Sequence, residues 1–388
     1  MRFRSLALLV VLIATTILAA IDFRALAQPV LAQSGYPPPD PPAAATSGPL
    51  NNHLFLPLVR KAIPVPATSY YVTNVGTLAS LGTAIGSEDS AATSAGRNRL
   101  VILHFGYPAS SGSNYGVKLS FSPTVFVPMV DVTNAVVAFA QNWYTNSASN
   151  TTAHLRIVLG VVNCCQSTNP NSDLALMQNH GTAWANAIQT IRTQTVGTIS
   201  SRVDVVAGYD MEYDWNRPYA STQWVNKFAA QGPAGCNTGS TGYDQGCIYN
   251  YGTMAVSVSG TTCATSVTTT TWVACDVWYA SWGATKSGVR VARALPQIYL
   301  PYDPSRPQYP WGVNATQWKD LSLFSANQMS AGPITFVGVL TQRARCGDGC
   351  TQGNNTPETG YWLLLNALAS NTTTKQTPRW STDISLQP

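Results

Sequence analysis

The chain alternates short apolar runs rich in β-branched residues with segments whose apolar residues recur at helical spacing. The apolar runs predict strands at 99–106, 154–162, 202–212, 247–255, 275–283, 295–300 and 334–342. Most are separated by predicted helices, at 130–143, 180–194, 222–231, 315–324 and 358–369. Strands that are apolar on both faces and joined through helices indicate a parallel sheet covered by helices. Seven such strands favour an α/β chain with a (β/α)8 TIM-type barrel, regular or irregular, over an open doubly wound sheet. The sequence also has no G-x-G-x-x-G after the first strand and no P-loop.

Two segments precede this pattern. Arg2 and Arg4 stand before an apolar run that ends near Ile21, and Ala25-Leu26-Ala27 is typical of a cleavage site. Residues 1–27 therefore read as a signal peptide for secretion to the extracellular space or cell surface, with an uncleaved membrane anchor as the alternative. Residues 28–68 are rich in proline and predict a linker and tether, so we expect one domain at 69–388, with no membrane span after cleavage.

The eight cysteines all follow the predicted signal peptide. An even number in an exported chain predicts disulfide-bonded loops. Proximity suggests Cys236–Cys247, Cys263–Cys275 and Cys346–Cys350, and leaves Cys164 and Cys165 bridged to each other or crossed with the others. The spacing does not fit a metal site, since no C-x-x-C occurs.

Three carboxylates stand two residues apart after the third apolar run, in VVAGYDMEYDWN. In an extended chain Asp210, Glu212 and Asp214 point to one face, at the end of a strand where barrel active sites form. Two carboxyl groups at one site can have their pKa values pushed apart, as cleavage of a glycosidic bond requires. Asp210 and Glu212 are our candidate catalytic residues. For Asp214 a helix-start role is the alternative to substrate binding.

Aromatic residues accompany the acids. Tyrosine and tryptophan offer an apolar face to sugar C–H groups together with a polar handle, although core packing is the commoner role of any single ring. We expect two or three of the following to bind substrate: Tyr213, Trp215, Tyr249, Tyr251, Trp278, Tyr279 and Trp282.

The ordered motifs YDME, IYNYG, DVWYASWG and LPQIY resemble the lysozyme-like glycoside hydrolases of family twenty-five and related secreted glycoside-hydrolase-like domains of unknown function. The resemblance covers about residues 98–300 as a pattern and implies a barrel. It implies Glu212 as general acid and Asp210 as its partner, with Tyr249, Trp278 and Gln297 as cleft residues. One position departs from the family pattern, because LVILHFGYP carries His104 where the family has an acid.

The sequence leaves two roles open for His104. A histidine at a strand end can shuttle protons or hold a carboxylate pair, and it can equally be a hydrogen-bonded core residue. His53, His154 and His180 show no ligand spacing such as H-E-x-x-H, so we expect neither a catalytic metal nor another cofactor.

The leading hypothesis is a secreted, monomeric glycoside hydrolase whose partner is a polysaccharide or peptidoglycan. The alternative is a catalytically silent barrel that binds glycan at the cell surface. Only 10% of residues are charged and no Lys/Arg cluster with interleaved aromatics occurs, which disfavours nucleic acid as a partner. A peptidase is also disfavoured, since there is no G-x-S-x-G motif.

Overall fold

The structure is a computed structural model that describes residues 67–92, 98–164, 169–195, 199, 201–212, 215–231, 248–253, 263, 272–282, 292–299, 315–346 and 355–388. The predicted signal peptide lies outside these residues, and so does the predicted linker up to residue 66. Within the described residues no helix combines the length and the apolar character that crossing a membrane requires.

A parallel sheet of eight strands forms the centre of the fold, with strand order β10-β11-β1-β2-β6-β7-β8-β9. Its strands are β1 (Ala67–Tyr71), β2 (Asn98–His104), β6 (His154–Val162), β7 (Val203–Asp210), β8 (Ile248–Asn250), β9 (Ala292–Ala294), β10 (Gly338–Thr341) and β11 (Trp380–Leu386). Parallel bridges Ala294–Phe336 and Gln297–Leu340 join the two edges. The sheet is therefore nearly closed and barrel-like, with neighbouring strands in chain order.

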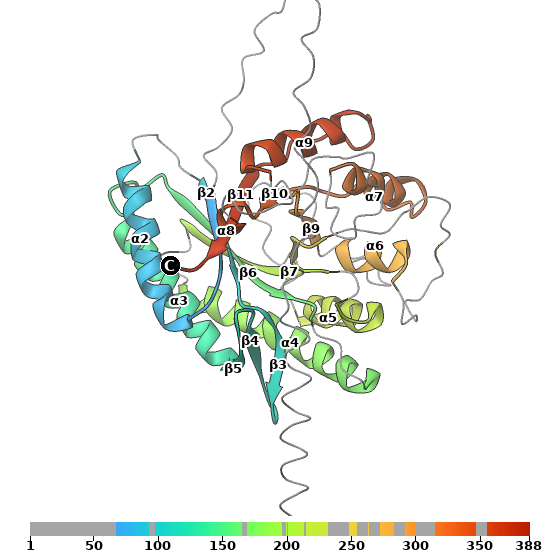
Figure 1. Ribbon diagram of the computed structural model, residues 1–388. Helices are drawn as coiled ribbons and strands as arrows, with labels where there is room; N and C mark the ends of the chain where they lie inside the picture. Colours follow the sequence, from blue (N-terminus) through green and yellow to red (C-terminus); the bar gives the residue numbers. More distant parts are fainter. Residues whose placement is uncertain are drawn as a thin grey trace, which may run out of the picture. The chain divides into compact units, whose positions relative to one another are not determined.

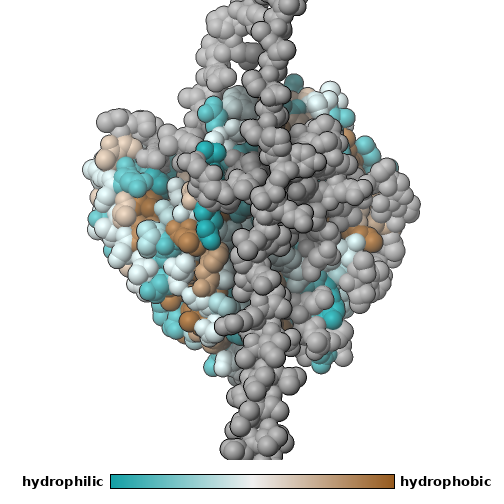
Figure 2. Space-filling view, in the orientation of Figure 1, coloured by the Kyte–Doolittle hydropathy of each residue, from teal (hydrophilic) through white to brown (hydrophobic). Residues whose placement is uncertain are grey.

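Helices connect the strands and surround the sheet (Figure 1). They are α2 (Leu78–Ala91), preceded by the short helix η1 (Val75–Thr77), then α3 (Met129–Asn146), α4 (Pro170–Thr195), α5 (Pro218–Gln231), α6 (Ala274–Trp282), α7 (Ala315–Asn327), α8 (Arg343–Cys346) and α9 (Pro357–Ala369). An antiparallel sheet of β3 (Tyr107–Ser111), β4 (Asn114–Leu119) and β5 (Ser122–Pro128) is inserted between β2 and α3. On the face in Figure 2, small apolar and polar areas alternate over the coloured residues.

The alternation of side chains along each strand divides the core into two layers. On β6, Leu155, Ile157 and Leu159 pack outward against the helices. Val158 points inward and packs with residues such as Val206 and Tyr251 in the interior of the sheet. Both faces of these strands are apolar for this reason, which confirms the reading of the runs at 154–162 and 202–212 as buried parallel strands.

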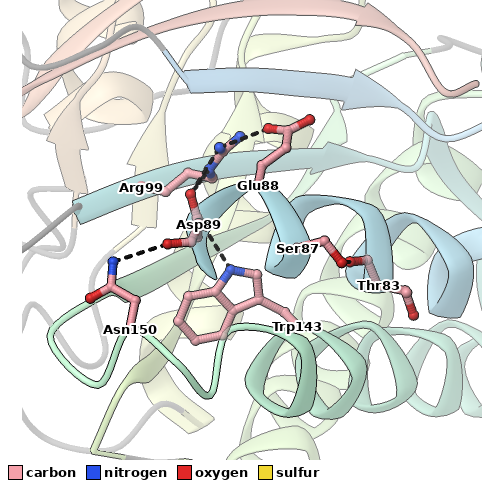
Figure 3. A network of polar contacts seen from close by, with 7 residues as sticks. All are labelled: Thr83, Ser87, Glu88, Asp89, Arg99, Trp143 and Asn150. Carbon is pink, nitrogen blue, oxygen red and sulfur yellow. Dashed lines mark hydrogen bonds and ion pairs between the residues drawn. The ribbon is translucent and has the colours of Figure 1, made fainter. Parts of the chain in front are cut away.

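A buried carboxylate ties α2 to its neighbours (Figure 3). Asp89 accepts hydrogen bonds from the guanidinium of Arg99 at 2.9 and 3.0 Å and from the indole of Trp143 at 2.9 Å, and its backbone oxygen accepts one from Asn150. Since one carboxylate joins a helix, the start of β2 and α3, these contacts fix how α2 packs on the sheet.

The sequence-based assignment of 275–283 as a strand is wrong, because this segment forms α6. The Asp276 carboxylate accepts a hydrogen bond from the backbone of Val273 at 3.1 Å, and the backbone of Val277 donates to Val273. These contacts begin a helix, and its buried residues Ala274, Val277 and Trp278 then lie on one helical face. The predicted strand at 295–300 also differs, since β9 precedes it and, among its described residues 295–299, only Gln297 takes part in a bridge.

One predicted disulfide is confirmed. Cys263 and Cys275 are bonded, across a separation of 12 residues. Cys164 is also disulfide-bonded, and no described cysteine is free. Cys165, Cys236, Cys247 and Cys350 lie outside the described residues, as does the side chain of Cys346, so the other predicted pairings stay predictions.

Candidate active site

Asp210 and Glu212 stand at the carboxyl end of β7 and both carboxyl groups are buried, with 7% of each residue exposed. The amide nitrogen Nε2 of Gln297 donates to Asp210 Oδ1 at 2.9 Å and to Glu212 Oε1 at 3.0 Å. The two oxygen atoms are therefore less than about 6 Å apart, since both lie within 3.0 Å of the same nitrogen. The hydroxyl of Thr253, beyond β8, donates to Glu212 Oε2 at 2.7 Å.

Burial raises the pKa of both carboxyl groups, because the charged form loses its hydration. The pKa of Asp210 rises well above its usual range, since the charge of Glu212 adds to the effect of burial. A hydrogen bond between the two carboxyl groups raises the pKa of Asp210 further and lowers that of Glu212. Of the two groups, Asp210 therefore favours its protonated form more strongly, while Glu212 keeps the hydrogen bonds from Thr253 and Gln297 that favour its ionised form.

A backbone clamp fixes the position of Glu212. The side chain of Asn163, directly after β6, donates to the Glu212 carbonyl at 2.8 Å and accepts from the Glu212 backbone N–H at 2.9 Å. The same amide nitrogen also lies 3.1 Å from the hydroxyl of Ser221. Because Asn163 is completely buried, Glu212 is held where the regular strand has already ended.

His104 ends β2 beside the pair. Its Nδ1 lies 2.8 Å from the hydroxyl of Tyr251 and 3.8 Å from Asp210 Oδ2, and its Nε2 lies 3.1 Å from Ser120 Oγ. Burial lowers the pKa of His104 to about 3, so the imidazole is neutral at neutral pH. His104 therefore serves as a hydrogen-bonding residue of the site and carries no charge there.

Two glycines make room for Tyr251. A Cβ atom at Gly160 would lie 2.0 Å from the Tyr251 hydroxyl oxygen, and one at Gly208 would lie 2.8 Å from its ring. Both glycines are register partners on adjacent strands β6 and β7. Their missing side chains allow the tyrosine to cross the interior and reach His104.

Further aromatic residues lie around the carboxyl ends. Burial raises the pKa of Tyr71, Tyr251 and Tyr299, and the nearby carboxyl groups of Asp210 and Glu212 raise it further where they are ionised. Tyr71 also makes edge contacts with the rings of His104 at 5.1 Å and Phe121 at 5.4 Å.

Two aromatic rings at this end are exposed. Phe121, in the turn between β4 and β5, is 47% exposed, and the guanidinium of Arg345 lies over its ring at 5.3 Å. Trp215 is 41% exposed, and its backbone N–H lies 3.5 Å from the Glu212 carbonyl.

The structure brings together Asp210, Glu212, His104, Tyr251 and Gln297, with Trp215 nearby. It places two of the expected cleft residues elsewhere. Trp278 packs with the core between helices and sheet, because its segment is helical. Tyr249 points toward the amino ends of the strands, where its hydroxyl accepts from Arg156 at 2.5 Å.

Other predicted site residues cannot be placed. Asp214 and Tyr213 lie outside the described residues, and so does the side chain of Trp282, whose backbone ends α6. In the part of the chain that the structure describes, no three His, Cys, Asp or Glu side chains are grouped so that they could hold a metal ion.

Sequence reasoning did not identify Tyr71, Ser120, Asn163, Thr253 or Tyr299. A signal existed for two of them, since Asn163 directly follows an apolar strand and Tyr299 ends the LPQIY motif. The remaining three come from segments without a distinctive pattern, and only the fold brings them to the pair.

No family model matches the chain, and comparison with curated proteins and with solved structures finds no match either.

Proposed function

We propose that the protein is a secreted glycoside hydrolase with a (β/α)8 TIM-type barrel, which cleaves cell-wall or extracellular polysaccharide through Asp210 and Glu212. The observation that carries the proposal is the buried carboxyl pair bridged by Gln297, at the ends of parallel strands. A structural role alone does not account for it, since two adjacent buried carboxyl groups cost stability unless they share a proton.

The pair supplies what the reaction needs. Asp210 transfers the shared proton to Glu212, which lies two residues further along the chain. Glu212 then donates it to the glycosidic oxygen of the leaving group as the bond to the sugar carbon breaks. The charge that remains on the pair then stabilises the oxocarbenium-like centre. The two carboxyl oxygens are closer than the separation of about 6.5–9.5 Å that inverting enzymes use for a water, so the geometry favours retention or assistance by a substrate group.

Several observations support a sugar ligand outside the cell. The exposed rings of Trp215 and Phe121 offer apolar surface near the carboxyl ends of the strands, and the buried Tyr251 and Tyr299 add hydroxyl groups, as does the partly buried Tyr71. The disulfide Cys263–Cys275 is typical of an oxidising compartment and supports secretion.

The direct test scores binding and turnover separately. The purified protein is incubated with insoluble peptidoglycan and with a panel of polysaccharides over about pH 4–8, a range that brackets carboxyl and histidine titration. Protein that sediments with the polymer measures binding, and new reducing ends in the supernatant measure cleavage. We expect both. Tight binding without any release would instead favour the catalytically silent glycan-binding barrel.

A further inference from the structure

Tyr299 lies on the same segment as Gln297, two residues further along the chain. The side chains of this segment alternate, because Leu295 and Tyr299 pack in the interior of the sheet whereas Ile298 packs outward against the helices. Gln297 therefore points to the same side as Tyr299, and its amide binds both carboxyl groups of the pair. Since the segment runs parallel to β10, Tyr299 stands beyond that amide, toward the carboxyl ends of the strands.

The hydroxyl of Tyr299 lies close to the carboxyl pair. Burial raises its pKa well above the usual range, and Tyr71, Asp210 and Glu212 raise it further where they are ionised. Asp383 acts in the same direction. The phenol group is therefore protonated at neutral pH, and it is a hydrogen-bond donor beside the pair.

This hydroxyl has no hydrogen-bond partner among the residues that the structure describes, although Tyr299 is only 9% exposed. The carboxylate of Asp383 is occupied, since it accepts from the hydroxyl of Thr341 at 2.9 Å and from the backbone of Ala344 at 2.8 Å. The hydroxyl of Tyr71 is near enough to interact, but the two hydroxyls do not meet the distance and angle of a normal hydrogen bond. The donor of Tyr299 is thus left unused by its described neighbours.

The backbone holds the ring in this position. The carbonyl of Tyr299 accepts from the backbone of Asn355 at 2.7 Å, and the side chain of Asn355 donates to the Ile298 carbonyl at 3.0 Å. The backbone of Ile298 donates to Leu340 at 2.9 Å. A buried hydroxyl without a partner costs stability, so its retention calls for an explanation outside the packing. A donor that is fixed before its ligand arrives loses little entropy on binding.

We propose that Tyr299 is a substrate-binding residue, whose hydroxyl donates a hydrogen bond to an oxygen atom of the sugar unit held against Asp210 and Glu212. The inference rests on the proposed function and adds a residue that selects the substrate. The pair is as deeply buried as Tyr299, so a sugar that reaches the pair also comes to this hydroxyl. A sugar unit with a free hydroxyl or carbonyl oxygen there gives the donor its partner, whereas a deoxy unit leaves it unpaired.

The first arm of the test measures the free protein. Tyr299→Phe removes the hydroxyl oxygen alone, and Tyr361→Phe is the matched control, because the buried hydroxyl of Tyr361 donates to the Pro378 carbonyl at 3.0 Å. Thermal unfolding should show an unchanged or higher Tm for Tyr299→Phe and a Tm about 2 °C lower for Tyr361→Phe, which loses a hydrogen bond. An equal loss in both variants would show that the Tyr299 hydroxyl is already paired, and would overturn the inference.

The second arm measures binding without cleavage, in the Glu212→Gln background. Sedimentation isotherms are recorded with insoluble peptidoglycan and with each polysaccharide of the same panel immobilised on beads. Adding Tyr299→Phe should weaken binding about tenfold, the loss of one hydrogen bond, and adding Tyr361→Phe should leave it unchanged.

The outcomes separate this inference from the proposed function. Equal binding with and without the Tyr299 hydroxyl overturns the inference, even where the wild type cleaves the polymer and the proposed function stands. Binding that weakens in Tyr299→Phe, together with a wild type that cleaves nothing, supports the inference and refutes hydrolysis. Absence of binding to every polymer overturns both.

Discussion

Neutralising Asp210 should make the protein more stable while it removes a group required for catalysis. In Asp210→Asn the amide oxygen can still accept from Gln297 and the amide nitrogen can donate to Glu212, so the variant reproduces the protonated carboxyl group. What it removes is the repulsion between two carboxylates. For two charges no more than about 6 Å apart at an effective dielectric constant of about 20, that repulsion is at least about 3 kcal/mol.

The pH dependence gives the sign of this effect. Because the pKa of Asp210 is raised on folding, the wild type loses stability as pH rises from the unfolded value, about 3.9, through the folded one. Asp210→Asn has no such loss. The gain in the free energy of unfolding should therefore be small near about pH 4 and grow toward its full size at alkaline pH.

Urea unfolding at a series of pH values measures this difference. Asp320→Asn provides a matched control, since its side chain is 45% exposed and its loss removes the same charge from the surface. The control should change stability by less than about 0.5 kcal/mol at every pH. If Asp210→Asn destabilises the protein, or stabilises it equally at all pH values, the two carboxyl groups do not share a proton and our reading of the pair is wrong.

Three further predictions follow from the packing around the pair. Gly160→Ala should lower the free energy of unfolding by about 1–3 kcal/mol in urea titrations, because its Cβ would meet the Tyr251 hydroxyl; unchanged stability would mean that Tyr251 does not cross the interior as described. The His104 resonances should not titrate by NMR between about pH 4.5 and 8, since burial keeps its pKa near 3, and a midpoint near 6.5 would show that the site is hydrated. Replacing Cys263 and Cys275 by serine should cost about 3 kcal/mol by thermal or urea unfolding, and a negligible cost would show that the short loop is ordered without its crosslink.

Much of the barrel-like sheet was predictable because its central strands are buried on both faces. The runs at 154–162 and 202–212 are apolar on both faces, as expected of strands in a parallel sheet that is covered on both sides. β1 and β11 were not predicted, because polar side chains occupy some of their buried positions and interrupt the apolar pattern. Ser69 and Thr382 share a hydrogen bond of 2.7 Å in the interior, and a pattern of serine and threonine does not predict a buried strand.

The helices α2 and α6 show two other limits of sequence reasoning. α2 contains Gly82 and Gly86, which read as helix breakers. The structure uses them for close approach, since a Cβ atom at either would lie within 2.6 Å of a carbonyl oxygen of α3. α6 was read as a strand because its tryptophan and tyrosine residues suit strands equally well, and no periodicity over nine residues separates the two.

The acids of the candidate site were predictable because Asp210 and Glu212 stand at the end of a recognisable apolar strand, whereas Gln297 was expected only from the family resemblance of the LPQIY motif. Ser120 and Thr253 were not predictable, because the inserted β3–β5 sheet brings Ser120 to His104 and the turn after β8 brings Thr253 to Glu212. The role of His104 was left open by the sequence. It is resolved by burial and by contacts from Tyr251 and Ser120, which make it a neutral hydrogen-bonding partner.

The most direct test of the central claim compares reducing-end release by the wild type and Glu212→Gln on a polysaccharide that the wild type cleaves. The glutamine keeps the acceptor for Gln297 and the shape of the side chain, but it cannot donate a carboxylic proton. Loss of general acid catalysis predicts a rate about 10²–10⁴-fold lower, with substrate binding retained. Glu358→Gln, in the first turn of α9, is the control and should keep the wild-type rate. A wild-type rate in Glu212→Gln would contradict the account.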